Sequence, residues 1–198
     1  MGRKIVAILG SYRQDGNLER AAALMLEAAR ARGAETQVFH LREQHIEFCT
    51  NCRTCMQAPG EARGHCVQQD DLETILTAAE GADALILGSP VNCFNTTALF
   101  RRFMERLVGF GYWPWGQNAP KARSKRRPRR AVLIATAAMP AFFIPWATGA
   151  PRALRLTAGL LGAKIAGKLW IGLAAQQPEA RLSAAVRQRA ERLGALLA

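Results

Sequence analysis

The sequence has 198 residues, which is enough for one full hydrophobic core and short for two, so we expect a single domain spanning residues 1–198. Its composition, 49 % hydrophobic and 21 % charged, excludes a disordered chain and a collagen-like one. No run of about 18 apolar residues occurs, and the apolar stretch after the basic N-terminus lacks a cleavage site. We therefore expect a cytoplasmic protein without a membrane span.

The formal net charge of +12 raises the question of a nucleic-acid partner. Much of this excess is local, because residues 121–130, KARSKRRPRR, contain seven basic residues and no acidic one. No aromatic residues are interleaved with these charges, as they are on single-strand-binding surfaces. We expect a basic surface loop at 118–130 and no nucleic-acid partner.

Short apolar runs alternate with helical patterns along the chain. The runs predict strands at residues 4–9, 36–41, 82–87, 131–136 and 165–172. The helices are expected at residues 17–32, about 70–81, 98–108, 150–161 and 178–197, the last one starting with Pro178 in its first turn. Such alternation predicts an α/β fold, an open five-stranded parallel sheet with helices on both faces.

Ligands of such sheets bind at the carboxyl ends of the strands, which directs attention to the loops at residues 10–17, 88–97 and 136–149. The first loop reads GSYRQDGN and opens directly onto a helix. A helix N-terminus attracts an anion; Ser11 adds a hydroxyl, Arg13 a guanidinium and Asn17 an amide, while Gly16 lets the backbone close around the group. Neither G-x-G-x-x-G nor G-x-x-x-x-G-K-[ST] is present, so a monophosphate is favoured. The alternative is a polar turn with a helix cap.

Three stretches together carry a family resemblance: Gly10-Ser11-Tyr12-Arg13 with Gly16-Asn17, then ADALILGSPV at 82–91, then Thr97-Ala98 with FMERL at 103–107. They resemble the NAD(P)H-dependent FMN reductase family of flavodoxin-like proteins, over nearly the whole chain. The resemblance implies FMN as cofactor, NAD(P)H as electron donor, a flavodoxin-like fold and a homodimer or homotetramer. It implies FMN contacts from Ser11, Arg13, Gly16, Asn17, Leu18, Pro90, Val91, Asn92, Cys93, Phe94, Asn95, Thr136 and Ala137.

In the second loop, Ser89, Pro90 and Val91 predict a rigid turn whose backbone N–H groups face the flavin. Many relatives carry a Tyr and another aromatic residue after this point, whereas here Asn92, Cys93 and Phe94 follow. Stacking over the ring then falls to Phe94 or to a partner subunit, and Cys93 is expected to be a packed small residue. Hydride transfer belongs to the flavin N5, so no catalytic side chain is assigned.

Four cysteines lie within an insert at residues 41–70, in the order Cys49-x2-Cys52-x2-Cys55-x10-Cys66. Four thiolates are the ligand set of a [4Fe-4S] cluster, and the resemblance is to the iron-sulfur flavoprotein branch in particular. Zinc, with His65 as a spare ligand, and a metal-free loop of reduced cysteines remain alternatives.

Two further features point beyond the cofactor. The basic run suggests attraction of the NADPH 2′-phosphate to a site beside the flavin, against the plain alternative of a solvated loop. Aromatic residues on two loops suggest either core packing or a subunit interface that covers the flavin: Tyr112, Trp113, Trp115, Phe142, Phe143, Ile144, Pro145 and Trp146.

The expected function is FMN-dependent oxidation of NAD(P)H, with electrons passed on to an acceptor such as a quinone, free flavin or nitroaromatic compound. One alternative is an iron-sulfur flavoprotein that carries electrons without direct nicotinamide activity. Another is a regulatory or nucleic-acid-binding protein that uses flavin as a sensor.

Overall fold

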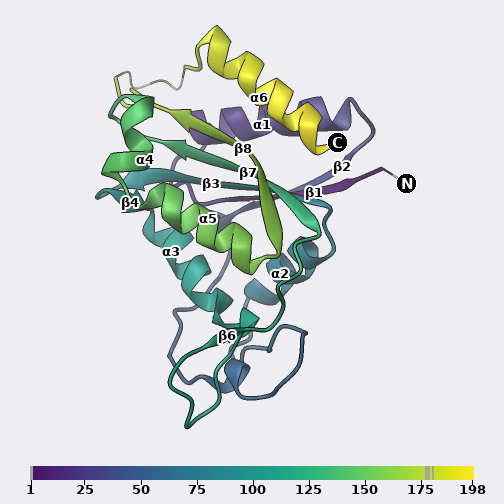
Figure 1. The fold of residues 1–198 in the computed structure, drawn as a ribbon. Coiled ribbons are helices and arrows are strands. Elements are labelled where there is room, and N and C mark those ends of the chain that lie inside the picture. The colour runs from purple at the N-terminus through teal and green to yellow at the C-terminus, as the bar shows by residue number, and fades with distance from the viewer. Residues whose placement is uncertain (1, 177–178, 180) are drawn as a thin grey trace.

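A parallel sheet of five strands forms the centre of the molecule in the computed structural model, which describes residues 2–176, 179 and 181–198 (Figure 1). The strand order is β2-β1-β3-β7-β8, and a short β4 pairs antiparallel with the end of β3. Their bounds are β1 Lys4–Leu9, β2 Glu35–His40, β3 Ala84–Asn92, β4 Asn95–Thr96, β7 Arg129–Thr136 and β8 Ala163–Ile171. This order confirms the flavodoxin-like fold predicted from the sequence.

Helices cover both faces of the sheet, because successive strand residues point to opposite sides. Val6 and Ile8 of β1 belong to the core under α2, α3 and α5, whereas Ile5, Ala7 and Leu9 belong to the core under α1 and α6. Figure 1 shows these two layers. The helices are α1 Asn17–Arg30, α2 Leu72–Glu80, α3 Ala98–Glu105, α4 Ile144–Ala147, α5 Ala150–Leu160 and α6 Ala184–Leu197. Among the described residues no helix is long and apolar enough to cross a membrane.

Two expectations about element bounds were wrong. The last helix begins at Ala184, where the Ser183 hydroxyl accepts from the Val186 N–H (3.3 Å), and Pro178 lies outside the described residues. The turn expected at 89–91 is part of β3, because Pro90 pairs with Thr136 and the strand continues to Asn92. The turn itself lies two residues later in the chain.

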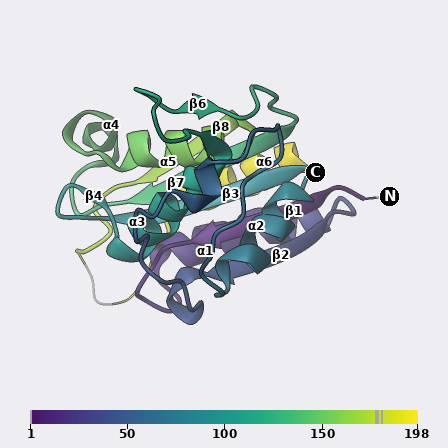
Figure 2. The same cartoon turned by 90° about the horizontal axis from the view of Figure 1, so that it is seen from below.

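Two chain segments outside the sheet form a lobe, defined here as residues 47–66 and 106–125. The lobe projects from the side of the molecule that carries α2 and α3 (Figures 1 and 2). The lobe contains two 3-10 helices, Thr54–Met56 and Arg106–Phe110, and a two-stranded ribbon of β5 (Gly111–Tyr112) and β6 (Lys121–Ala122). It therefore brings the cysteine-bearing insert against the first part of the basic run. Two more 3-10 helices lie outside the lobe, at Leu41–Glu43 and Ala141–Phe143.

Gly10 marks the point where β1 meets α3, and it leaves no room for a side chain. A Cβ at this position would lie 2.7 Å from the Cβ of Phe100, which is fully buried. We expect Gly10→Ala to lower the free energy of unfolding by about 1–3 kcal/mol, because the core must shift to admit a methyl group. Urea unfolding measures this. Gly81→Ala is the matched control, since its Cβ would meet nothing closer than Thr77 O at 3.5 Å, and an equal loss there would contradict the explanation.

Candidate functional site

The loop between β1 and α1 ends in a helix N-terminus without a side-chain cap. Gly16 occupies the cap position, and the first helical hydrogen bond runs from the Arg20 N–H to Gly16 O (3.0 Å). The N–H groups of the first turn of α1 therefore lack backbone acceptors within the helix, and they carry the positive end of its dipole. An anion at this position would satisfy them.

A cavity of about 330 Å³ opens in front of this helix end, at the carboxyl ends of β1, β3 and β7. All but three of the thirteen predicted contact residues line it. The lining residues are Ser11, Tyr12, Arg13, Gly16, Asn17, Leu18, Pro90, Val91, Asn92, Thr136, Ala137, Ala138, Ala174 and Ala175. The structure thus brings together segments that are far apart in the sequence.

The sequence analysis missed Tyr12, Ala138, Ala174 and Ala175. The last two follow β8, so the rule that ligands bind at strand carboxyl ends could have pointed to them. The Ala174 N–H donates to Ala137 O (2.9 Å), and this bond fixes the segment as one wall of the cavity.

Two polar side chains of the phosphate loop are held in place. The Ser11 hydroxyl donates to Arg13 O (3.0 Å) and accepts from the Arg13 N–H (3.1 Å). Asn17 Nδ2 donates to Ala174 O (3.4 Å), whereas its Oδ1 is buried and has no partner among the described residues. A buried amide oxygen without a partner is costly, and a hydroxyl donor from a ligand would remove this cost. The donor set therefore fits a phosphate ester with a polyol chain, as FMN has.

Glu19 places a carboxylate in the first turn of α1, close to the expected anion. Its charge is compensated by Arg42, which hydrogen-bonds to it, and by contacts with His40 Nδ1 (3.0 Å) and the Asp15 N–H (3.0 Å). Burial alone would lower the pKa of Arg42, but the hydrogen bond and charge of Glu19 raise it. The network holds Asp15 in its left-handed conformation (φ 54°) and neutralises the acid beside the anion site.

Cys93 and Phe94 form the tip of the hairpin between β3 and β4, with positive φ values of 46° and 59°. The Gly149 N–H donates to Phe94 O (2.7 Å), which docks this tip on the start of α5. Cys93, Phe94 and Asn95 are consequently absent from the cavity lining. The Cys93 side chain is exposed, so the expectation that it packs as a small buried residue was wrong.

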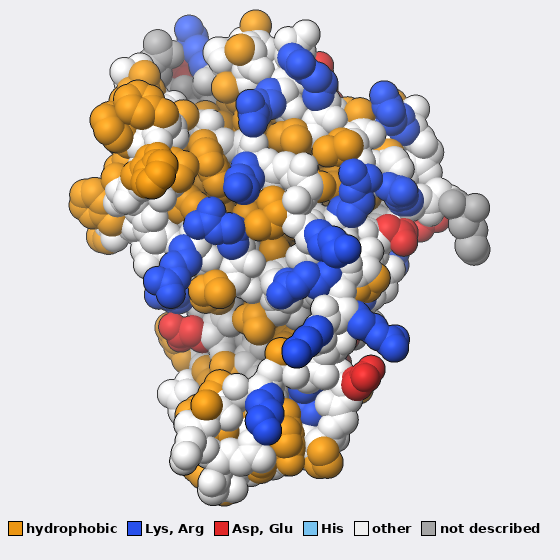
Figure 3. All heavy atoms as spheres, viewed as in Figure 1, with side chains coloured by type: hydrophobic (Ala, Val, Ile, Leu, Met, Phe, Trp, Pro, Cys, Tyr) orange, Lys and Arg blue, Asp and Glu red, His pale blue; other side chains and the backbone are white. Residues whose placement is uncertain are grey.

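The aromatic loop at 141–147 is exposed. Phe142 is 67 % and Trp146 88 % accessible, and only Ile144 of this group is fully buried. Figure 3 shows hydrophobic side chains gathered over α4 and the neighbouring hairpin. Packing of these rings within the monomer core is therefore ruled out, and we define Phe94, Phe142, Phe143 and Trp146 as the aromatic patch.

The basic run lies at the amino end of β7, whereas the cavity lies at the carboxyl ends of the strands. Arg129 begins β7 and Thr136 ends it, so these two ends are separated by about 23 Å at about 3.3 Å per residue. The hypothesis that this run attracts NADPH to a site beside the flavin does not fit this arrangement.

The four cysteines of the insert lie in the lobe as free thiols. Burial raises the pKa of Cys55, and negative charge on Cys66, Cys49 and Cys52 would raise it further. The thiols are thus close enough to influence one another electrostatically. Hydrogen bonds from the Thr54 hydroxyl and N–H lower the pKa of the exposed Cys52.

The cysteines of the insert do not form a preformed site for a single metal ion. Within the described part of the chain no three His, Cys, Asp or Glu side chains converge as one ion requires. His65 instead contacts the Glu73 carboxylate (3.4 Å). A [4Fe-4S] cluster differs from a single ion, because each thiolate binds a separate iron and the four sulfurs need not converge on one atom.

Two arginines tie the insert to the rest of the lobe. Arg123 donates to the carbonyls of Cys55 (3.1 Å), Gly60 (3.1 Å), Gly109 (2.9 Å) and Gly111 (3.1 Å). Arg53, between Cys52 and Cys55 in the sequence, lies between two indole rings, 3.9 Å from the Trp113 centroid and 4.1 Å from that of Trp115. The sequence contained no local sign of either contact.

We expect Arg53→Ala to loosen the insert, because it removes both ring contacts and the hydrogen bond to Trp113 O (2.6 Å). The free energy of unfolding should fall by about 1–2 kcal/mol, and the tryptophan emission should shift to the red. Fluorescence and thermal unfolding test this. Arg102→Ala serves as the control, since its guanidinium lies 5.5 Å from the Phe48 ring; an identical spectrum in the Arg53 variant would contradict the contact.

An open parallel sheet in this strand order, with an uncapped helix N-terminus and a cavity at its strand ends, defines a protein of the flavodoxin-like class. The chain belongs to the NADPH-dependent FMN reductase family, whose sequence model matches residues 3–140.

Comparisons with individual proteins agree with this assignment. An iron-sulfur flavoprotein from Archaeoglobus fulgidus is 37 % identical over 111 residues, which are 56 % of this chain and 48 % of that protein. An azoreductase structure from Bacillus anthracis has a TM-score of 0.71 at 12 % identity, covering 98 % of this chain and 99 % of the other. An NAD(P)H:quinone oxidoreductase from Methanothermobacter marburgensis has a TM-score of 0.67 at 16 % identity, covering 98 % of each chain.

These structural likenesses establish the fold. The chain spans about half the length of the curated relatives it matches.

Proposed function

We propose that this chain binds FMN in the cavity at the strand ends and oxidises NAD(P)H, passing the electrons to a separate acceptor. The observation that carries the proposal is the uncapped N-terminus of α1, which opens into that cavity beside the buried Asn17 amide. FMN when bound supplies hydride acceptance at N5 and onward electron transfer. The chain's share of the work is binding, orientation and electrostatics.

In this proposal the phosphate binds at the α1 N–H groups with Arg13 as a further donor, and the Ser11 hydroxyl turns from Arg13 O to donate to it. The Asn17 amide oxygen accepts from a hydroxyl of the sugar chain. Pro90, Val91 and Asn92, with the 136–138 and 174–175 segments, line the rest of the cavity and would contact the flat ring. No side chain is required to move a proton in the hydride step, and we assign none.

Rapid mixing of the FMN-loaded protein with NADPH or NADH under anaerobic conditions tests the nicotinamide activity. We expect loss of flavin absorbance in a single saturable phase, followed by recovery when a quinone is added. A flavin that keeps its colour with both nucleotides would contradict the proposal and would favour the electron-carrier function.

A second candidate, an iron-sulfur flavoprotein that carries electrons without nicotinamide activity, is favoured by the four clustered thiols. In that case Cys49, Cys52, Cys55 and Cys66 hold a [4Fe-4S] cluster. Such a cluster also supplies the positive charge that would keep the Cys55 thiol deprotonated. The same cluster is compatible with the first candidate, as a relay for single electrons.

Anaerobic purification followed by iron assay and an absorption spectrum tests the cluster. We expect iron and a broad band near about 400 nm in the wild type, from cluster charge transfer. Both should be lost in Cys55→Ser and retained in Cys93→Ser, because Cys93 lies on the β3–β4 hairpin outside the lobe. Flavin bands without iron would exclude the cluster.

The remaining parts of the proposal concern assembly and location. The aromatic patch beside the cavity supports a homodimer or homotetramer, with the patch at the subunit contact. Five free cysteines support a reducing compartment, the cytoplasm. We propose one FMN-binding domain over residues 1–198.

A further inference from the structure

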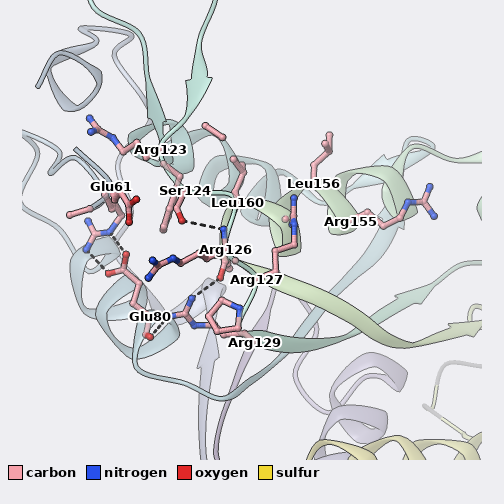
Figure 4. A pocket seen from close by; sticks show the side chains of 18 residues that line it. Glu61, Glu80, Arg123, Ser124, Arg126, Arg127, Arg129, Arg155, Leu156 and Leu160 are labelled. Atoms are coloured by element: carbon pink, nitrogen blue, oxygen red, sulfur yellow. Dashed lines mark hydrogen bonds and ion pairs between the residues drawn. The ribbon is translucent and has the colours of Figure 1, made fainter. Parts of the chain in front are cut away.

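A second cavity, of about 470 Å³, lies at the amino end of β7, at the other end of the strands from the proposed flavin site (Figure 4). It is bounded by the residues leading into β7, the C-terminal half of α5 and the part of the cysteine insert around Arg63. We call it the arginine cleft. Nothing in the proposed FMN chemistry makes use of it.

The cationic lining of the cleft consists of arginine alone. Six arginines and no lysine line it, against two carboxylates: Arg63, Arg123, Arg126, Arg127, Arg129 and Arg155, with Glu61 and Glu80. Glu80 is engaged by Arg63 (3.2 Å). Arginine predominates over lysine in the whole chain, and its planar guanidinium fork matches phosphate oxygens in pairs.

Three of these arginines have structural partners. Arg63 pairs with Glu73 (2.8 Å) as well as Glu80, and Arg123 binds the four lobe carbonyls described above. Arg129 donates to Leu161 O (3.2 Å) and to Glu80 O, and its Nε is buried without a partner among the described residues. These three build the walls of the cleft.

Arg126 and Arg127 are not used in this way. No carboxylate of the described residues pairs with either, and Arg127 makes only a long contact to Ala163 O (3.5 Å). In Figure 4 the Arg126 side chain extends toward Glu80, whereas that of Arg155 points away from the centre. Ser124 Oγ accepts from the Arg126 N–H (3.2 Å), so its own hydrogen is free to donate. Arg126, Arg127 and the Ser124 hydroxyl therefore all line the cavity with donors that no carboxylate of the described residues occupies, and such donors suit a phosphate group.

The other side of the cleft is apolar. Leu156 and Leu160 of α5 are 49 % and 38 % exposed, and Phe110 and Pro128 also line the cavity. A free phosphate would leave this surface uncovered, whereas a ligand with a flat apolar ring would bury it.

We propose that the arginine cleft binds a nucleoside diphosphate, with its phosphates on Arg126, Arg127 and Ser124 and its base against Leu156 and Leu160. The site is distinct from the FMN site and does not depend on the proposed redox activity. Because Arg63 comes from the cysteine insert, the ligand would contact the insert and the sheet domain at once.

Isothermal titration of the protein as purified with ADP tests the proposal, with flavin fluorescence recorded to detect displaced FMN. We expect saturable binding without flavin release, and weaker binding of pyrophosphate and of adenosine. The Arg126→Ala, Arg127→Ala double variant should raise the Kd for ADP about 10-fold to 100-fold, because two charge-assisted contacts are lost. A Lys125→Ala, Lys164→Ala variant removes the same charge outside the cleft and should change the Kd less than about 2-fold.

Several outcomes would overturn the proposal. One is absence of ADP binding to the wild type, and another is binding that releases FMN. Equal losses in the two double variants, or adenosine binding as tightly as ADP, would remove the role of Arg126 and Arg127. A single-stranded RNA that binds more tightly than ADP, and weakens equally in both variants, would identify the arginines as part of a general polyanion-binding face.

Discussion

Asn17→Asp is expected to weaken FMN binding at least about 100-fold while leaving the stability of the FMN-free protein nearly unchanged. The substitution places a carboxylate at the end of α1 where the phosphate is proposed to bind. Two charges of like sign about 4 Å apart repel with on the order of 4 kcal/mol at an effective dielectric constant of about 20. That repulsion exceeds what is needed for a 100-fold loss.

Stability responds differently because the same carboxylate is favourable at a helix N-terminus. The helix dipole stabilises it by about 0.3–1 kcal/mol, which offsets the loss of the long hydrogen bond from Asn17 Nδ2 to Ala174 O (3.4 Å). A variant that simply misfolded would lose both properties. A large loss of binding with almost no loss of stability therefore identifies an anion site.

Flavin fluorescence titration of the FMN-free protein and thermal unfolding measure the two quantities. Gln188→Glu makes the same charge change on exposed α6 and should alter FMN affinity less than about 2-fold. If Asn17→Asp bound FMN within threefold of the wild type, the phosphate would have to lie elsewhere.

Arg106→Leu is expected to be the most destabilising single substitution in the lobe. Arg106 Nη1 lies 2.6 Å from Asp70 Oδ2, both side chains are only 1 % exposed, and the same nitrogen donates to Glu47 O (2.7 Å). Removing the arginine leaves a buried carboxylate without its cation, which costs about 3–5 kcal/mol. For a chain of this length we expect the Tm to fall by roughly 10 °C.

The double variant Arg106→Leu, Asp70→Asn separates loss of the pair from loss of packing. It removes the unpaired charge, so it should recover a substantial part of the stability lost in the single variant. Thermal unfolding of both variants at pH 7 makes the comparison. Equal Tm values for the single and double variants would show that Asp70 is not left as an uncompensated charge.

The same pair gives the protein a specific sensitivity to acid. Burial alone would raise the pKa of Asp70, but hydrogen bonds from Arg106 and from the N–H groups of Glu47 and Leu72 lower it below its usual value. A carboxylate with a lowered folded-state pKa contributes stability above its unfolded pKa of about 4 and loses it as the pH falls through the folded value. Wild-type stability should therefore drop below about pH 4, and Asp70→Asn should remove this part of the drop.

The order of strands and helices could be read from the sequence because the signals are local. The first strand was expected at residues 4–9 and is observed at Lys4–Leu9, since a short apolar run flanked by polar residues suits a strand buried on both faces. The prediction of a phosphate site at residues 10–17 likewise rests on eight consecutive residues. Its Ser, Arg, Gly and Asn indicate anion chemistry without reference to any distant part of the chain.

Local signals failed where two distant segments determine the outcome. Pro90 was read as part of a turn, yet it lies inside β3 because Thr136 of the neighbouring strand pairs with it. The hairpin tip was expected to face the flavin, but the hydrogen bond from Gly149 to Phe94 holds it against α5, outside the cavity lining. Thr136 lies far from Pro90 in the sequence, and Gly149 lies far from Phe94.

The sequence by itself determined the fold class, because periodicity acts over fewer than about twenty residues, and its loop chemistry predicts an anion site at residues 10–17. Only the tertiary structure decided where the basic and aromatic side chains lie and what they contact. It placed the basic run at the amino end of β7, set Arg126 and Arg127 along an open cleft, left Trp146 exposed and paired Arg106 with Asp70. These outcomes depend on packing between segments tens of residues apart, which composition and spacing do not encode.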